Sequence, residues 1–129
     1  MAADETGEYK PKIGSIGWHD LTVPNADDVR DFYQSVAGWT ADALDMGGYS
    51  DYVMKPAEGD PAGGICHQRG VNADLPPVWM MYIVVADIEA SAAKVTELGG
   101  KILKGPTGGT HNYCVIRDPA GAICALYQA

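Results

Sequence analysis

The sequence predicts an α+β domain: two copies of a strand–helix–strand–strand–strand unit form a curved eight-stranded mixed sheet around a pocket, with the helices on its outer face. Three observations support this fold class. The length of 129 residues is typical of one domain. Sixteen glycines and eight prolines indicate many short elements joined by turns. A helix-type segment that ends at glycine occurs twice, at corresponding places in the two halves.

The internal repeat sets the predicted domain organisation. When Leu21 is placed over Tyr82, an offset of 61 residues, Gly38 falls on Gly99. The two halves share this pattern rather than identical residues. We therefore expect a single domain over 13–129, with modules at 13–67 and 78–128, a polar linker at 68–77 and a flexible lead-in at 1–12.

The first module opens with a strand at 13–23, where apolar and polar residues roughly alternate until Pro24. Asn25 is expected to cap a helix, and Gly38 to end it in the left-handed conformation. One apolar stripe of this helix has helical spacing and comprises Val29, Phe32, Tyr33 and Val36. Three further strands are expected at 39–45, 49–55 and 63–67.

The second module repeats the order, with a strand at 78–86 and a helix capped by Asp87. The inner face of this helix is expected to consist of Ile88, Ala92, Val95 and Leu98. The closing strands are expected at 101–104, 112–117 and 122–128. Between the last two, the sequence Asp-Pro-Ala-Gly at 118–121 predicts a tight turn.

Composition excludes several functional classes. A net charge of −8 opposes binding to nucleic acid. The sequence has no basic amphipathic stretch and no apolar run near the roughly 20 residues of a spanning helix, so no membrane partner is expected. Residues 1–12 do not resemble a secretion signal, and the odd set of three cysteines has no metal-ligand spacing. We therefore expect a cytoplasmic protein with reduced thiols.

Several segments in order resemble the vicinal oxygen chelate superfamily, which contains glyoxalase, the fosfomycin and bleomycin resistance proteins and extradiol dioxygenases. They are Trp-His-Asp-Leu-Thr-Val at 18–23, Asp-Phe-Tyr at 31–33, Gly-Trp at 38–39, 82–87, Leu-Gly-Gly-Lys at 98–101 and the turn at 118–121. The turn is the strongest of these motifs. The resemblance implies paired βαβββ modules, a small-molecule ligand and a homodimer.

Metal-dependent members of that superfamily hold a divalent ion on the concave face. The resemblance places their ligand positions at Trp18, Trp79 and Ala125 of this sequence. Neither indole nor methyl groups bind a hard or borderline divalent ion, which requires carboxylate, imidazole or thiolate donors. We therefore expect no metal site and no cofactor.

Strand alternation predicts which residues line the pocket. In the first strand, Leu21 and Val23 should face the helix, leaving Trp18, Asp20 and Thr22 toward the pocket. In the second module, Tyr82 and Val84 should face the helix. The residues then left toward the pocket are Trp79, Met81 and Ile83. The last strand should also line the pocket, through Ile123, Ala125 and Tyr127. The predicted ligand-binding set is Trp18, Asp20, His67, Trp79, Met81, Tyr113, Ala125 and Tyr127. This mostly aromatic lining suits a planar small molecule, whereas packing of Trp18 directly on Trp79 would leave no cavity.

Asp20 is the candidate catalytic residue, because a carboxylate beside an indole could act as a base or bind a ligand amine. A solvated charge at the rim is the alternative. His67 and His111 could add acid–base chemistry or an unusual metal site, or could simply be exposed strand-end residues. The sequence thus favours a metal-free protein that binds a hydrophobic or aromatic molecule. The alternatives are a lyase, isomerase or dioxygenase-type enzyme with an unorthodox metal set or Asp/His chemistry, and a domain that only pairs with another protein.

Overall fold

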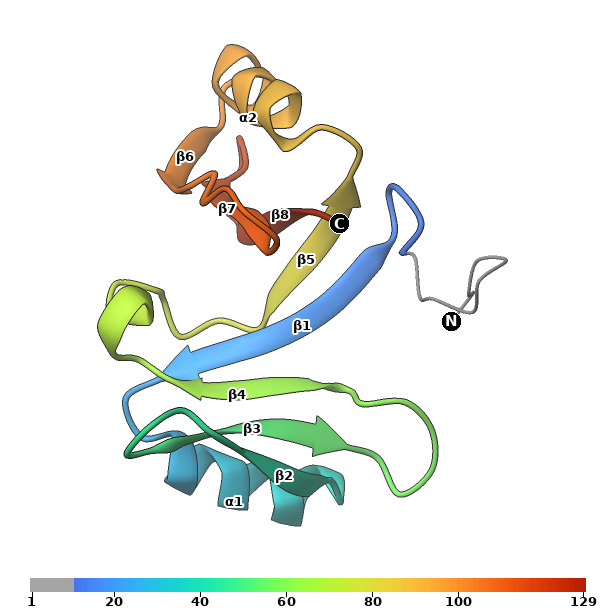
Figure 1. The fold of residues 1–129 in the computed structure, drawn as a ribbon, viewed down its shortest axis with the longest axis vertical. Coiled ribbons are helices and arrows are strands. Elements are labelled where there is room, and N and C mark those ends of the chain that lie inside the picture. The colour runs from blue at the N-terminus through green and yellow to red at the C-terminus, as the bar shows by residue number, and fades with distance from the viewer. Residues whose placement is uncertain (1–10) are drawn as a thin grey trace. The chain divides into compact units, whose positions relative to one another are not determined.

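The structure, a computed structural model, describes residues 11–129; most of the predicted lead-in at 1–12 lies outside them. In chain order the elements are β1 (Ile16–Val23), α1 (Ala26–Ala37), β2 (Thr40–Asp45), β3 (Ser50–Lys55), β4 (Gly63–His67), a short 3-10 helix (Gly70–Asn72), β5 (Met80–Val85), α2 (Ile88–Glu97), β6 (Lys101–Lys104), β7 (Asn112–Arg117) and β8 (Ile123–Gln128). This order, visible in Figure 1, confirms the α+β class and the doubled βαβββ module.

The chain folds as two compact units, each with a four-stranded mixed sheet. One unit spans Trp18–Trp79, and the other combines Met80–Ala129 with the described residues up to Gly17. In the first, β1 pairs in parallel with β4, and β4, β3 and β2 follow in antiparallel order. In the second, β5 pairs in parallel with β8, and β8, β7 and β6 follow in the same way. The two modules therefore share one strand order and one pairing pattern.

Helix α1 covers one face of the first sheet (Figure 1). The buried core beneath it consists of Leu21, Val23, Ala26, Tyr52, Met54 and Ile65. From the helix, Val29 and Tyr33 pack against this core, whereas Phe32 and Val36 are 56% and 66% exposed. Only one side of the predicted apolar stripe is therefore buried, because α1 contacts the sheet through Ala26, Val29 and Tyr33.

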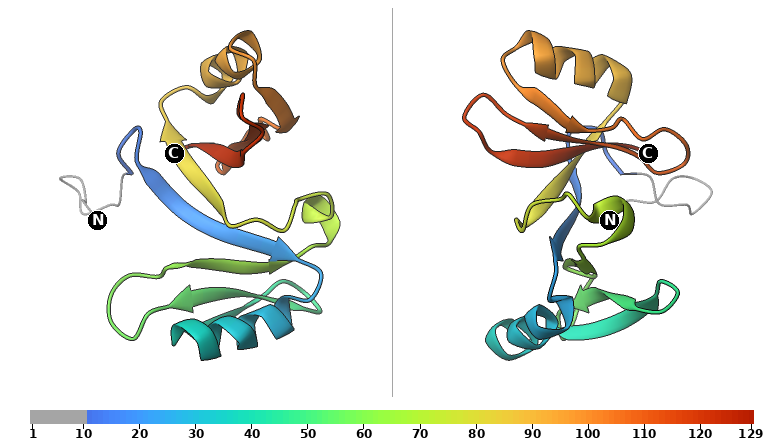
Figure 2. Two further views of the ribbon diagram at one scale, coloured as in Figure 1. Left: turned by 180° about the vertical axis from the view of Figure 1, so that it is seen from behind. Right: turned by 90° about the vertical axis from the view of Figure 1, so that its left-hand side faces the viewer.

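Helix α2 covers the second sheet in the same manner, as the right-hand view of Figure 2 shows. Its core consists of Ile88, Ala92, Cys114, Ile116 and Leu126, with Ile83, Val85, Val95, Ile102 and Cys124 partly buried around it. The sequence placed Leu98 in this core, but its side chain is 69% exposed. The helix ends at Glu97, so Leu98 is already the C-cap residue and leaves the helical stripe.

The helix ends follow the predicted signals in three of four places. The Asp87 carboxylate accepts the Ala90 N–H at 3.1 Å, and Gly38 ends α1 with φ 72°. Helix α2 likewise stops just before Gly99, whose φ is 94°. The exception is Asn25, whose side chain makes no capping bond.

The two modules correspond at an offset of 62 residues, not 61. Their helices begin at Ala26 and Ile88, and their first strands end at Val23 and Val85. Ile83 and Val85 consequently pack toward α2, while Tyr82 and Val84 point away from it, the reverse of the prediction. Side chains alternate along a strand, so a slip of one residue moves every side chain of β5 to the other face.

Candidate functional site

Trp18 and Asp20 lie together on the face of the first sheet opposite α1, here called the helix-free face. Asp20 pairs with Gly64 across the β1–β4 ladder. A Cβ atom built on Gly64 would lie 3.4 Å from the Asp20 Cβ and 3.6 Å from the Trp18 Nε1. The indole nitrogen of Trp18 and the Cβ atom of Asp20 therefore both lie beside Gly64, which has no side chain to fill the space next to them.

Cys66 lies next along this face, between β1 and β3. It pairs with Thr22 of β1, and Asp51 of β3 stands opposite it in the register. Burial, followed by the charges of Asp20 and Asp51, raises the pKa of the Cys66 thiol to about 12. Cys66 therefore stays a neutral thiol at physiological pH and is a poor nucleophile, because the reactive species is the thiolate.

Trp79 does not share this face, contrary to the prediction. Its indole packs on the α1 side against Tyr33 and Trp39, with ring centroids 5.3 and 5.9 Å away. Its Nε1 donates a hydrogen bond to the Tyr33 hydroxyl at 2.9 Å. The alternative of Trp18 packed directly on Trp79 is also wrong, because Trp79 is engaged by these partners on the opposite face.

His67 likewise lies on the α1 side, at the end of β4. Its Nδ1 is 3.4 Å from an oxygen of Asp51, and its Nε2 is 3.6 Å from an oxygen of Asp27 in the first turn of α1. The same Asp27 oxygen accepts the Tyr52 hydroxyl at 2.5 Å, a bond that raises the pKa of Tyr52. His67 thus belongs to a polar junction between α1, β3 and β4, and the structure does not bring it together with Trp18 and Asp20.

Sequence reasoning missed the roles of Asp27 and Asp51. Acidic residues are common in the first turn of a helix, so the position of Asp27 gave no reason to expect its hydrogen bond with Tyr52. Asp51 is 6% exposed and accepts the backbone N–H of His67 at 2.8 Å. Neither contact has a local sequence signal, because the first depends on the packing of α1 against the sheet and the second on how β3 and β4 are aligned.

The helix-free face of the second sheet carries three tyrosines. Tyr113 pairs with Tyr127, and Tyr82 with Ala125. The rings of Tyr82 and Tyr113 are 6.2 Å apart. Met81 was predicted on this face but points to the opposite side, as does Ile83; Tyr82 replaces them because of the register slip described above.

The corrected register also changes the residues at the positions used by metal-dependent relatives. The counterpart of Trp18 is Met80, which is 3% exposed, and not Trp79. The three positions therefore carry an indole at Trp18, a thioether at Met80 and a methyl group at Ala125. Within residues 11–129, no group of three or more His, Cys, Asp or Glu side chains is arranged to hold a metal ion. The donor types at these positions do not fit a divalent cation.

Over the described part of the chain, none of the helices has the length and apolarity needed to cross a bilayer.

A model of the Glyoxalase/Bleomycin resistance protein/Dioxygenase superfamily matches residues 12–125. The chain belongs to this superfamily. Among curated relatives, it is 32% identical over 126 residues to CFP32 of Mycobacterium tuberculosis, a protein named as a candidate glyoxylase, and the match covers 95% of this chain and 48% of CFP32. It is 29% identical over 102 residues to the anthracycline biosynthesis protein DnrV of Streptomyces peucetius, with 79% and 36% covered. The chain thus spans half or less of the length of these relatives.

Solved structures show the same fold. The hypothetical protein BH1468 from Bacillus halodurans C-125 is similar with a TM-score of 0.58 at 14% identity, covering 89% of this chain and 94% of that one. A methylmalonyl-CoA epimerase from Streptomyces coelicolor gives a TM-score of 0.52 at 16% identity, covering 92% and 96%.

Proposed function

We propose that the protein binds a small hydrophobic or aromatic molecule on the helix-free face of its first module, without a divalent metal. The observation that carries this proposal is that the Trp18 indole nitrogen and the Asp20 side chain meet beside Gly64, which has no side chain of its own. An indole ring is a flat apolar surface against which a ligand ring can stack, and Gly64 adds no side chain beside it. Asp20 adds a carboxylate that can accept a hydrogen bond from the same ligand.

The electrostatics of this face favour a neutral or cationic ligand. Burial, and after it the negative charges of Asp20 and Asp51, raises the pKa of the Cys66 thiol. Because that thiol stays protonated, the face carries the two carboxylate charges without an added thiolate. A ligand with a negative charge would be repelled there.

The relatives support an aromatic ligand class. Two matched proteins, DnrV and DauV from streptomycetes, are named for anthracycline biosynthesis, and anthracyclines are planar aromatic compounds. The name of CFP32 supports a second candidate, a glyoxalase-type enzyme. In this chain the group best placed for such chemistry is Asp20, as a base on a ligand stacked against Trp18.

The proposal is tested by metal analysis of the purified protein, followed by fluorescence titration with an anthracycline and with 2-naphthol. We expect less than stoichiometric metal and saturable quenching in the presence of a chelator. Trp18→Ala should weaken binding about tenfold or more, on the scale of a stacked aromatic contact. Trp39→Phe, which alters an indole on the α1 side, serves as the matched control and should leave the affinity unchanged.

Quenching that requires an added divalent ion, or that survives Trp18→Ala, would contradict the metal-free site. Consumption of a ligand that Asp20→Asn abolishes without loss of binding would instead favour the enzyme.

A further inference from the structure

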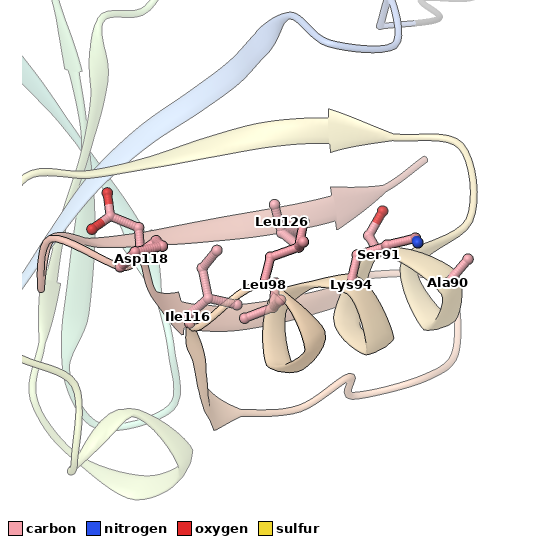
Figure 3. A pocket seen from close by; sticks show the side chains of 10 residues that line it. Ala90, Ser91, Lys94, Leu98, Ile116, Asp118 and Leu126 are labelled. Atoms are coloured by element: carbon pink, nitrogen blue, oxygen red, sulfur yellow. The ribbon is translucent and has the colours of Figure 1, made fainter.

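An apolar groove runs along α2 on the helix side of the second sheet (Figure 3). Ile116 of β7 and Leu126 of β8 form its floor, and α2 forms its wall. The wall residues are Ala90, Ser91, Lys94, Val95 and Leu98. The volume of about 540 Å³ lies within the range of small-molecule sites, roughly 300–1,000 Å³. All of these residues belong to one unit and lie on the face opposite Tyr82, Tyr113 and Tyr127.

The first module shows what fills the corresponding region of its own helix. At the offset of 62, Val95 corresponds to Tyr33 and Lys101 to Trp39. In the first module, Tyr33 stacks on Trp39 at 5.7 Å and both rings contact Trp79. Three aromatic rings thus pack beside α1. In the second module, Val95 stands in place of Tyr33 and Lys101 in place of Trp39, and an open groove lies beside Val95.

The charged groups at the rim of the groove are already satisfied. Lys94 pairs with Glu97 at 3.2 Å, and the Asp118 carboxylate accepts the N–H groups of Ala120 and Ala122 at 2.8 and 3.0 Å. An ionic ligand would have to compete with these partners, so the rim favours a neutral occupant.

Ser91 supplies a polar group to the wall of the groove. In the first module, an indole N–H is held by a hydroxyl of the helix, that of Tyr33, at 2.9 Å. Ser91 provides a hydroxyl from the same face of α2, one turn before Val95. A ring that carries an N–H or O–H donor could therefore be held in the same manner as Trp79.

We propose that the groove beside α2 is a second binding site, which takes a neutral aromatic ring of the indole or phenol type with its N–H or O–H directed at Ser91. The site is separate from the helix-free face around Trp18 and stands whether or not that face binds a ligand.

The probe is indole, titrated into the protein while the methyl signals of Val95, Leu98, Ile116 and Leu126 are followed by NMR. We expect saturable shifts of these methyl signals, which Trp18→Ala leaves unchanged. Val95→Phe places a ring where Tyr33 has one and should weaken indole binding about tenfold or more. Val71→Phe, the same exchange at a position that is 79% exposed and lies outside both the groove and α1, is the matched control and should have no effect on indole binding.

The hydrogen bond is tested with 1-methylindole, which lacks the N–H donor. We expect it to bind about three- to tenfold more weakly than indole, and Ser91→Ala to remove that difference. Absence of saturable shifts at these methyl groups, or unchanged affinity in Val95→Phe, would overturn the site. Equal binding of indole and 1-methylindole would overturn the role of Ser91.

Discussion

Cys66 illustrates how neighbouring side chains decide the chemistry of a single residue. Its position on the helix-free face, close to the proposed ligand, would suit a nucleophile. Burial and the charges of Asp20 and Asp51 instead keep it a thiol. The face is therefore suited to binding through contacts rather than through covalent attachment to this sulfur.

The raised pKa of Cys66 predicts a pH dependence of stability. Because the folded-state pKa, about 12, exceeds the usual value of 9.0, the stabilisation is fully present below pH 9 and is lost as pH rises toward 12. Chemical denaturation at pH 8 and pH 10.5 should therefore show a larger loss of unfolding free energy for the natural protein than for Cys66→Ala. An equal loss in both proteins would show that Cys66 does not titrate differently on folding.

At the scale of elements, the β1–β4 ladder depends on two adjacent glycines with different roles. A Cβ atom on Gly63 would lie 2.6 Å from the backbone oxygen of His19, so this glycine permits the close approach of the two strands. A Cβ atom on Gly64 would make contacts of 3.4 Å or more and would point toward Trp18 and Asp20. Gly63 is thus needed for the fold, and Gly64 shapes the face proposed to bind the ligand.

These two glycines form a matched pair for mutagenesis. Gly63→Ala should destabilise the protein by about 1–3 kcal/mol, since backbone atoms must move apart. Gly64→Ala should cost less stability but should weaken ligand binding on the helix-free face, because a methyl group would fill the space beside Trp18 and Asp20. Urea denaturation and the fluorescence titration measure the two effects. The reverse order of stabilities would contradict the assigned roles.

The whole molecule exposes several large apolar side chains, among them Phe32 and Val36, which lie one turn apart on α1. The resemblance to the superfamily implies a homodimer, and we propose that α1 contributes to its interface. Exposed apolar patches commonly mark such surfaces.

Sedimentation equilibrium should therefore give twice the chain mass of 13.7 kDa. The double substitution Phe32→Ser, Val36→Ser should shift the protein toward the monomer, with Leu98→Ser on α2 as the control for loss of an exposed leucine. A monomer in the natural protein, or a dimer unaffected by the double substitution, would contradict this interface.

The sequence by itself determined the order of the two α-helices and eight strands, although not the short 3-10 helix at Gly70–Asn72, because alternation, helical stripes and glycine or proline turns are local signals. It predicted the Asp87 cap and placed β4, β6 and β7 at the bounds observed. It also brought Trp18 and Asp20 to one face, since their strand was correctly aligned with the helix that follows.

Only the tertiary structure decided the register of β5 and the partners of Trp79, His67 and Asp51. The two modules share a pattern but few residues, so offsets of 61 and 62 fit the sequence almost equally well, yet they place opposite sides of β5 against α2. Contacts such as Trp79 with Tyr33, or His67 with Asp27, join residues 46 and 40 positions apart. They form because distant segments pack together, and this packing leaves no periodic trace in the chain.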